Sequence, residues 1–376
     1  MVSVDKIYST FLSNGVDFFT GVPDSLLKNI CAYITDNTPV KKNIIAANEG
    51  AALGIAAGYH MASGKLPLVY MQNSGLGNTV NPLLSLADEK VYSLPILLMI
   101  GWRGEPGVKD EPQHIKQGEV TLALLNAMQV PYIILDADED KALVQINDII
   151  KSARSRNIPH AIVIRKDTFG KYKLKTVPSN NFTVSREEAL KLVVDSLQDN
   201  DIVVSTTGKL SRELFEYRES KSQGHEKDFL TVGSMGHSSS IALGIAIENK
   251  DRNVFCLDGD GAFIMHMGAI SNIGNLSLKN YKHILFNNGS HESVGGQPTL
   301  GFQLDIPSIA TACGYKKAIV ATSREKILEA MTILQKTDGP VLLEIKVKIE
   351  SRENLGRPTT TPQENKNDFM NFLNKK

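Results

Sequence analysis

The sequence predicts an α/β fold with two doubly wound parallel-sheet domains. Short runs of Val, Ile and Leu without polar alternation recur along the chain, as in strands that are buried on both faces of a parallel sheet. Stretches of helical period lie between these runs, and this alternation is typical of α/β folds. The length of 376 residues suits two domains of roughly 150 residues each. The polar segment 169–185 has neither period, so we place the domain boundary there.

The same two patterns predict the individual elements. Apolar runs predict strands at residues 42–46, 66–71, 96–100, 132–135, 161–165, 201–205, 254–257, 283–286 and 341–346. Helical periods predict helices at residues 49–62, 83–90, 120–128, 141–154, 186–198, 236–248 and 324–335. The tail from residue 350 is polar and has no strong pattern. We expect either a solvated end or a lid that closes over a site with Arg352 and Arg357.

Composition excludes several classes of protein. Lys plus Arg and Asp plus Glu both number 41, and this zero net charge argues against a nucleic-acid or anionic-membrane partner. The three cysteines, Cys31, Cys256 and Cys313, have no CxxC spacing, so neither a disulfide framework nor a thiolate metal site is expected. Apolar runs such as residues 94–100 fall far short of the ~20 residues of a membrane span, and no signal peptide is evident. We therefore expect a cytoplasmic protein.

The strongest chemical signal is an Asp-Gly-Asp-Gly run at 258–261, directly after the predicted strand 254–257. A second predicted strand, 283–286, leads into Asn-Asn-Gly-Ser at 287–290. Carboxylate and amide oxygens at the ends of parallel strands suit Mg²⁺, and glycines let the backbone approach a diphosphate. Each motif alone reads as an ordinary turn. Together, at this spacing, they favour a metal–diphosphate site.

This pair of motifs resembles the signature of thiamine diphosphate enzymes. The resemblance implies thiamine diphosphate and Mg²⁺ as cofactors. It assigns Asp260 and Asn288 as side-chain Mg²⁺ ligands and the carbonyl of Ser290 as the third protein ligand, with Asn287 as the fallback for a register error of one. The glycines of the first motif would lie against the cofactor: Gly259 and Gly261.

Glu49 is the candidate that activates the cofactor. It follows a predicted strand and opens an Ala- and Gly-rich helix, where an acidic residue is also favoured simply by the helix dipole. The stretch resembles the decarboxylase branch of the family, and this resemblance implies that Glu49 protonates N1′ of the aminopyrimidine. The resemblance also assigns the loop beginning at Gly75 to pyrimidine binding. By the same resemblance Met235, in Gly-Ser-Met-Gly, would wedge the bend of the cofactor; the alternative is a core methionine at the start of a helix.

Two segments resemble the substrate-facing loops of these enzymes. Ser25 stands where pyruvate decarboxylases have a catalytic Asp, and Val294 stands where they have a Glu. These departures point away from a plain pyruvate decarboxylase. The polar loop 110–114 contributes His114, which either relays a proton or is an ordinary surface residue. Catalytic roles are therefore assigned to Glu49, Ser25 and His114.

The resemblance also gives the domains names and limits. Residues 1–168 would form the pyrimidine-binding domain, 169–185 a linker, and 186–376 the diphosphate- and Mg²⁺-binding domain with its tail. The chain lacks room for the third, central domain that most relatives carry. It resembles the short decarboxylases of 2-oxoacids with a phosphonate on C3, which serve phosphonate biosynthesis, and next those with a sulfonate. Candidates to hold that anionic group are Arg103, Lys209, Arg212, Arg357 and the turn 290–291.

In this family Glu49 of one subunit would serve the Asp260 site of another, so the resemblance implies a homodimer or larger homo-oligomer. The partner is otherwise a small 2-oxoacid. Three rival functions remain: an acetolactate-synthase-like carboligase, a non-catalytic binding protein, and a Rossmann dehydrogenase. The missing central domain argues against the carboligase, and the presence of Glu49 argues against the non-catalytic binding protein. The lack of a Gly-x-Gly-x-x-Gly motif argues against the dehydrogenase.

Overall fold

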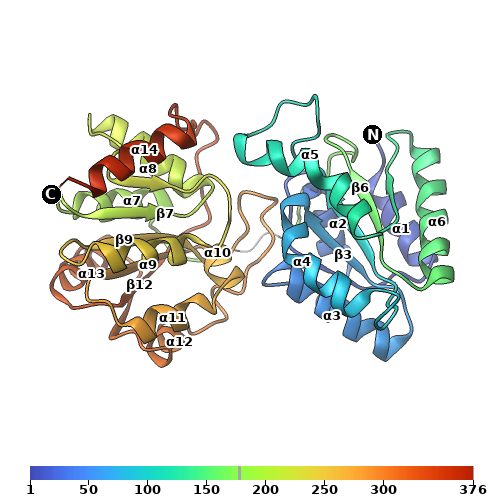
Figure 1. Cartoon of the computed structure of the whole chain (residues 1–376), viewed down its shortest axis with the longest axis horizontal. Coiled ribbons are helices and arrows are strands. Elements are labelled where there is room, and N and C mark those ends of the chain that lie inside the picture. Colours follow the sequence, from blue (N-terminus) through green and yellow to red (C-terminus); the bar gives the residue numbers. More distant parts are fainter. Residues whose placement is uncertain (177–178, 376) are drawn as a thin grey trace. The chain divides into compact units, whose positions relative to one another are not determined.

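The computed structural model describes residues 1–176 and 179–375. Residues 177 and 178 of the predicted linker, and residue 376 of the predicted second domain, lie outside the described part. The chain divides into two compact units, shown in Figure 1. Unit 1 comprises Met1–Val177 and His291–Pro298, and unit 2 comprises Pro178–Ser290 and Thr299–Lys376. Each unit is described by itself below, and the predicted limits at residues 168 and 186 stay a prediction.

Unit 1 contains a six-stranded, fully parallel sheet in the order β2-β1-β3-β4-β6-β5. Its central strands are almost entirely buried, which explains their continuous apolar sequence. The strands are β1 (Phe19–Gly21), β2 (Asn43–Ile45), β3 (Leu68–Gln72), β4 (Leu97–Gly101), β5 (Tyr132–Ile134) and β6 (His160–Ile164).

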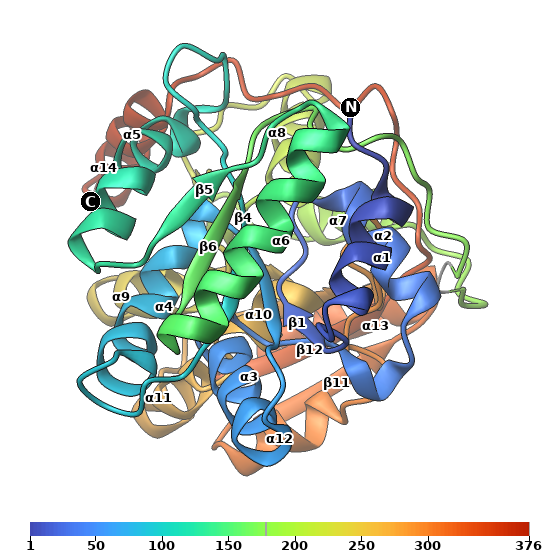
Figure 2. The ribbon, with the colours of Figure 1, turned by 90° about the vertical axis from the view of Figure 1, so that its right-hand side faces the viewer.

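Helices cover both faces of this sheet, and each face has its own apolar core. One core joins α1 (Val4–Ser13), α2 (Lys28–Asn37) and α6 (Glu139–Arg156) to the sheet, and Figure 2 looks onto this side. The other core joins α3 (Glu49–Ser63), α4 (Leu76–Pro82) and α5 (Pro112–Ala127) to the opposite face. Short helical turns complete the unit: η1 (Val40–Lys42), η2 (Asn73–Gly75) and η3 (Leu83–Ala87).

Unit 2 repeats this architecture with a second six-stranded parallel sheet, in the order β11-β12-β10-β9-β7-β8. The strands are β7 (Ile202–Ser205), β8 (Asp228–Leu230), β9 (Val254–Gly259), β10 (Tyr281–Asn287), β11 (Lys317–Ala321) and β12 (Val341–Lys346). The predicted α/β class with two parallel sheets is therefore confirmed.

The helices of unit 2 also divide between two cores. On one face lie α7 (Arg186–Asp195), α8 (Lys209–Ser220) and α13 (Arg324–Lys336). On the other face lie α9 (Ser238–Glu248), α10 (Asp260–Met265), α11 (Ala269–Leu276), α12 (Ile306–Ala312) and α14 (Pro362–Leu373).

Each sheet has a point at which the chain reverses the direction in which it adds strands. In unit 1 this point lies between β1 and β3, because β2 was added on the other side of β1. In unit 2 it lies between β7 and β9, because β8 was added on the other side of β7. Ligands bind at the carboxyl ends of strands at such points in α/β sheets. The fold therefore places one candidate ligand edge in each unit.

Several predicted elements need correction. The helix expected at 83–90 begins earlier, as α4, and ends in the π-helical turn η3, so residues 88–90 lie outside it. Helix α5 starts at Pro112, which occupies its first turn, rather than at residue 120. As a result His114 belongs to a helix and not to the predicted polar loop. The tail carries α14, which begins with a capping box between Thr361 and Glu364.

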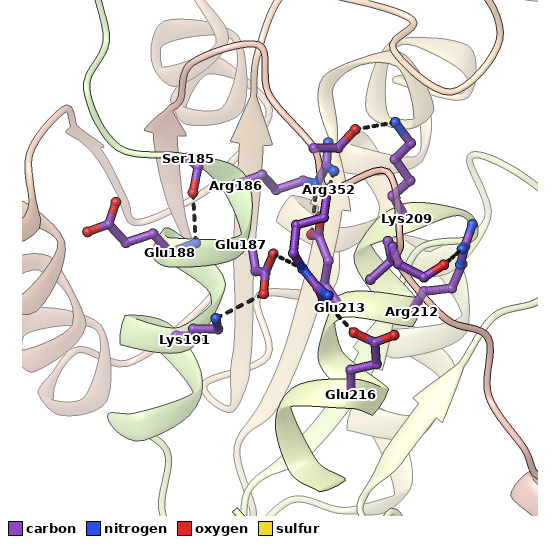
Figure 3. A network of polar contacts seen from close by, with 12 residues as sticks. Ser185, Arg186, Glu187, Glu188, Lys191, Lys209, Arg212, Glu213, Glu216 and Arg352 are labelled. Atoms are coloured by element: carbon purple, nitrogen blue, oxygen red, sulfur yellow. Dashed lines mark hydrogen bonds and ion pairs between the residues drawn. The ribbon is translucent and has the colours of Figure 1, made fainter. Parts of the chain in front are cut away.

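The first part of the tail is fastened to unit 2 by polar contacts, which Figure 3 shows. The Arg352 Nε atom donates to Glu187 Oε2 at 2.8 Å, and the Arg352 guanidinium also pairs with Glu216. Arg212 donates to the carbonyl oxygens of residues 355 and 356, and Lys209 donates to Ser351. Arg352 is therefore engaged in holding the tail on α7 and α8. These contacts do not support the predicted lid role of Arg352.

Candidate functional site

Glu49 lies at the first position of α3, just after β2, and its side chain is buried. The Asn48 side chain caps the helix by accepting a hydrogen bond from the backbone N–H of Ala51. One carboxylate oxygen of Glu49, Oε2, accepts a hydrogen bond of 2.7 Å from Asn78 Nδ2. The fold therefore holds this carboxyl group in a defined position at the carboxyl edge of the sheet.

Gly75 lies directly against the Glu49 carboxyl group. A Cβ atom at position 75 would come within 2.4 Å of Glu49 Oε1, closer than any real contact allows. Glycine at this position therefore leaves space for the carboxyl group where it lies, and a larger residue would displace that group. The structure thus brings two of the predicted residues of unit 1 into contact.

Ser25 belongs to a polar cluster at the same edge. Arg103 Nη1 donates to Ser25 Oγ at 2.7 Å, and the rest of the guanidinium grips Asp110 with two donors. Burial works against the charge of Asp110, but hydrogen bonds from Arg103 and the Gly104 N–H outweigh it and lower the pKa of Asp110. Asp110 therefore holds the Arg103 guanidinium in place, and Arg103 in turn orients the Ser25 hydroxyl.

His114 lies in the first turn of α5 beside this cluster. Burial lowers the pKa of His114 to about 4, and the nearby Arg103 charge adds to this effect while Asp110 opposes it. Its Nδ1 atom is buried and finds no hydrogen-bond partner within the described ranges. The imidazole is therefore neutral at pH 7, so it can accept a proton there but does not begin as a cation.

Asp260 and Asn288 lie at adjacent strand ends in unit 2. β9 and β10 pair with Gly259 opposite Phe286, so the residues that follow each strand emerge side by side. Asp260, Asn288 and Ser290 are all buried. Burial raises the pKa of Asp260 to about 6, because its carboxylate has lost water. A divalent cation would remove that cost.

Asn287 has a different role from Asn288. Its Nδ2 atom donates to the Gly301 carbonyl and to Glu344 Oε1, both at 2.7 Å, inside the unit. The Asn288 Oδ1 atom accepts from the Ser290 N–H at 2.9 Å, in the turn beyond the strand. This arrangement favours Asn288 over the fallback Asn287 as a ligand.

The oxygens of this site fit Mg²⁺ and a diphosphate. A Cβ atom at position 301 would come within 2.8 Å of Asp260 Oδ2, so only glycine at this position leaves room beside the carboxylate, which accepts a hydrogen bond from Thr299 Oγ1. Ser290 Oγ is buried and has no hydrogen-bond partner among residues 1–176 and 179–375. The Asp260 carboxylate and the Asn288 amide oxygen are hard-oxygen donors that suit Mg²⁺, and the unsatisfied Ser290 hydroxyl is a further polar group beside them, separate from the Ser290 carbonyl that is the predicted ligand. Gly259 and Gly261 flank Asp260 and add no side-chain bulk beside it.

Met235 lies near this site in unit 2. The following residue, Gly236, has φ +86°, and a Cβ atom there would approach Ala262 O at 3.0 Å and Met265 Cβ at 3.2 Å. The loop with Met235 therefore packs on α10, the helix that Asp260 begins. Its predicted cofactor contact, like the roles of the other site residues, stays a prediction.

Sequence reasoning missed several buried polar residues around these sites. Asp24 lies next to Ser25, accepts hydrogen bonds from the N–H groups of residues 26 and 27, and has its pKa raised by burial. Asn73 donates to the Arg103 carbonyl at 2.8 Å. Asp258 belongs to the motif that the sequence singled out, but its contacts were not foreseen: it lies 3.5 Å from the buried His283 ring, which contacts the Tyr315 hydroxyl. A polar residue directly after an apolar strand is the signal that would have identified Asn73, which follows β3.

Comparison with known proteins matches both units. The N-terminal thiamine pyrophosphate-binding domain model of thiamine pyrophosphate enzymes matches residues 2–126, and the C-terminal model matches residues 206–345. A phosphonopyruvate decarboxylase from Streptomyces viridochromogenes is 31% identical over 99% of this chain and 95% of its own length. The chain belongs to the thiamine diphosphate-dependent decarboxylase family. Its cofactor is thiamine diphosphate.

Two further relatives align with most of this chain. A phosphonopyruvate decarboxylase from Streptomyces hygroscopicus is 30% identical over 99% of this chain and 94% of its own length. A sulfopyruvate decarboxylase from Methanosarcina acetivorans is 27% identical over 87% and 86%. Among the described residues, no helix is long and apolar enough to cross a membrane.

Proposed function

We propose that this protein decarboxylates 3-phosphonopyruvate to phosphonoacetaldehyde and CO₂, using thiamine diphosphate and Mg²⁺, as a step of phosphonate biosynthesis. The full-length similarity to two phosphonopyruvate decarboxylases carries the proposal. The C1–C2 bond breaks, CO₂ leaves, and a proton takes its place on the former ketone carbon. Bound thiamine diphosphate supplies the electron sink for the pair that CO₂ leaves behind.

The residues of unit 1 hold and move protons. Asn78 fixes one oxygen of Glu49, and we assign the proton that activates the cofactor to the other oxygen, Oε1. The Ser25 hydroxyl, oriented by Arg103, faces the substrate in this proposal. His114, which is neutral at pH 7, accepts or relays a proton.

The residues of unit 2 hold the metal and the diphosphate. Asp260 and Asn288 bind Mg²⁺ through side-chain oxygens, and Ser290 binds through its carbonyl. Buried hard oxygens at the ends of β9 and β10 support this assignment. Gly259 and Gly261 give the diphosphate access to the backbone.

We also propose a homodimer, or a larger assembly built from dimers, in which Glu49 of one subunit serves the Asp260 site of another. This proposal rests on the family resemblance and on the distribution of the site residues over two units. Neither unit alone contains both the acid and the metal ligands.

The test is CO₂ release from phosphonopyruvate, sulfopyruvate and pyruvate, each with and without thiamine diphosphate and Mg²⁺. A cofactor-dependent preference for phosphonopyruvate is the expected result. A preference for sulfopyruvate, which the Methanosarcina relative makes the second candidate, would change the substrate and retain the cofactors. A condensed hydroxy-oxoacid as product, instead of an aldehyde, would indicate a carboligase. No release from any substrate would overturn the proposal.

A further inference from the structure

A cavity of about 220 Å³ opens in unit 1 at the carboxyl edge of its sheet. It is far larger than the roughly 30 Å³ that one water molecule occupies. Three segments line it: the loop after β1, the loop between β4 and α5, and the turn after β6. The lining side chains used below are Ser25, Trp102, Arg103, Lys109, Asp110 and Lys166.

The strand order places this cavity on the same edge as Glu49. β1, β3, β4 and β6 are consecutive neighbours in the sheet, and β2, which leads to Glu49, pairs with β1. Since all strands are parallel, the loops that follow them emerge on one side. A second link is direct: Asn73 binds the backbone of Arg103, and Gly75, two residues later, contacts Glu49. The cavity and Glu49, the proposed proton donor, therefore lie on the same edge of the sheet and are connected through residues 73–75.

The charges of the cavity do not cancel. Asp110 is paired with Arg103, and Glu105 is paired with Arg165 at 2.8 Å. Both acidic side chains of the lining are thus neutralised by arginines. The two remaining cations, Lys109 and Lys166, are exposed and make no ion pair within the described part of the chain. The cavity therefore presents two unbalanced positive charges next to the hydrogen-bonded cluster of Ser25, Arg103 and Asp110.

We propose that this cavity binds the C3 phosphonate of the substrate, with Lys109 and Lys166 as its counter-charges. The inference deepens the proposed function and rests on it for the identity of the substrate. A phosphonate dianion matches two lysine ammonium groups, which act as mobile point charges and do not require a fixed geometry. Arg103 is already held by Asp110, so it shapes the cavity and orients Ser25. Pyruvate carries no second anionic group, so it would leave both lysines unpaired.

The chain offers a built-in reporter for this site. Trp102 is the only tryptophan in the sequence, and it lines the cavity with its indole N–H bonded to the Gly118 carbonyl at 2.9 Å. The experiment titrates methylphosphonate into the enzyme loaded with thiamine diphosphate and Mg²⁺ and follows tryptophan fluorescence. We expect a saturable change that acetate at equal ionic strength does not produce. No saturable change, or an equal response to acetate, would overturn the inference.

The lysines are tested with a charge-matched control. The double variant Lys109→Gln/Lys166→Gln should weaken methylphosphonate binding about 10- to 100-fold, since two charge-assisted contacts are lost. The control Lys41→Gln/Lys151→Gln removes two exposed lysines, of which Lys41 lies in η1, just before β2 and so at the opposite edge of the sheet. It should bind as the wild type does. Equal affinities of both double variants would overturn the inference.

Steady-state kinetics separate this inference from the proposed function. In Lys109→Gln/Lys166→Gln the KM for phosphonopyruvate should rise by a similar factor while kcat changes little, and the preference over pyruvate should shrink. Wild-type decarboxylation combined with an unchanged KM in the variant would refute the cavity and leave the proposed function standing. If the protein decarboxylates none of the oxoacids but still shows the fluorescence response to methylphosphonate, the proposed function is refuted and the anion-binding cavity is retained.

Discussion

Gly75 decides where the Glu49 carboxyl group lies. An alanine at this position would place its Cβ within 2.4 Å of Glu49 Oε1 and push the carboxyl group away. We expect Gly75→Ala to reduce kcat about 10²-fold, because a displacement near 1 Å at a catalytic group has this effect. The measurement is CO₂ release at saturating substrate, thiamine diphosphate and Mg²⁺.

Gly170→Ala is the matched control for this substitution. Its added Cβ would make only an ordinary contact, 3.5 Å from the Val2 carbonyl oxygen, so activity should stay at the wild-type level. Gly75→Ala with wild-type turnover would show that the position of the Glu49 carboxyl group does not limit catalysis.

His114 gives the protein a defined pH response. Its pKa is about 4 in the folded chain, below its ordinary value of 6.5, so the unfolded chain takes up the proton first as the pH falls. The contribution of His114 to the free energy of unfolding is therefore complete above pH 6.5 and declines between pH 6.5 and about 4. Denaturant titrations across this range should show a smaller slope with pH in His114→Gln. An unchanged slope, or an imidazole that titrates near 6.5 by NMR, would contradict the prediction.

Residues within local motifs were predictable from the sequence, whereas their partners were not. Asp260 and Asn288 each follow an apolar strand, so the pattern itself places them at strand ends. Asn78 meets Glu49 across 29 positions, and Asn73 meets Arg103 across 30. Such contacts depend on strand order, which hydrophobic periodicity does not specify.

Among the elements, α14 is a helix that the sequence pattern did not predict. Its apolar residues lie at the end of a long polar run, so no helical period stood out. The structure buries Phe369 against Phe229, with ring centroids 5.5 Å apart, while the next residue, Met370, is 49% exposed. The capping box at Thr361 was readable from the sequence, and it would have indicated where this helix starts.

Phe369→Ala should therefore destabilise unit 2. Removing a buried phenylalanine costs about 3–5 kcal/mol, because apolar contacts are lost and a cavity remains. The neighbouring substitution Met370→Ala should change the free energy of unfolding by about 0.5 kcal/mol or less. Denaturant unfolding of both variants measures the difference. Equal unfolding midpoints would mean that α14 is not packed as described.

The same reasoning explains which other elements were found. The central strand β4 is buried along its length and reads as a continuous apolar run. The central strand β10 is equally buried, and its apolar residues 284–286 gave the signal although the strand also contains Lys282, His283 and Asn287. The edge strand β11 has exposed and half-buried positions, and β1 has only three residues, so neither gives that signal. Helix α8 was missed because its charged residues hide its apolar face. Burial on both faces, more than strand propensity, thus determined which strands the sequence revealed.

At the scale of the whole molecule, the chain carries two parallel-sheet units whose candidate residues are complementary. Unit 1 supplies Glu49 and the cluster of Ser25, Arg103 and Asp110 that we propose to face the substrate, and unit 2 supplies Asp260 and Asn288. If the two sets meet between the subunits of a dimer, a mixed dimer of two inactive variants can contain one intact site. A site formed within one subunit could not be restored in this way.

Subunit mixing tests this arrangement. Glu49→Gln and Asp260→Asn should each be nearly inactive, because one lacks the proposed proton donor and the other a proposed metal ligand. After denaturation together and refolding, a mixed dimer would contain one site with both residues intact. Half of the dimers would be mixed and half of their sites intact, so about a quarter of wild-type activity should return. Activity that stays at the level of the separate variants would place Glu49 and Asp260 of each site in the same subunit.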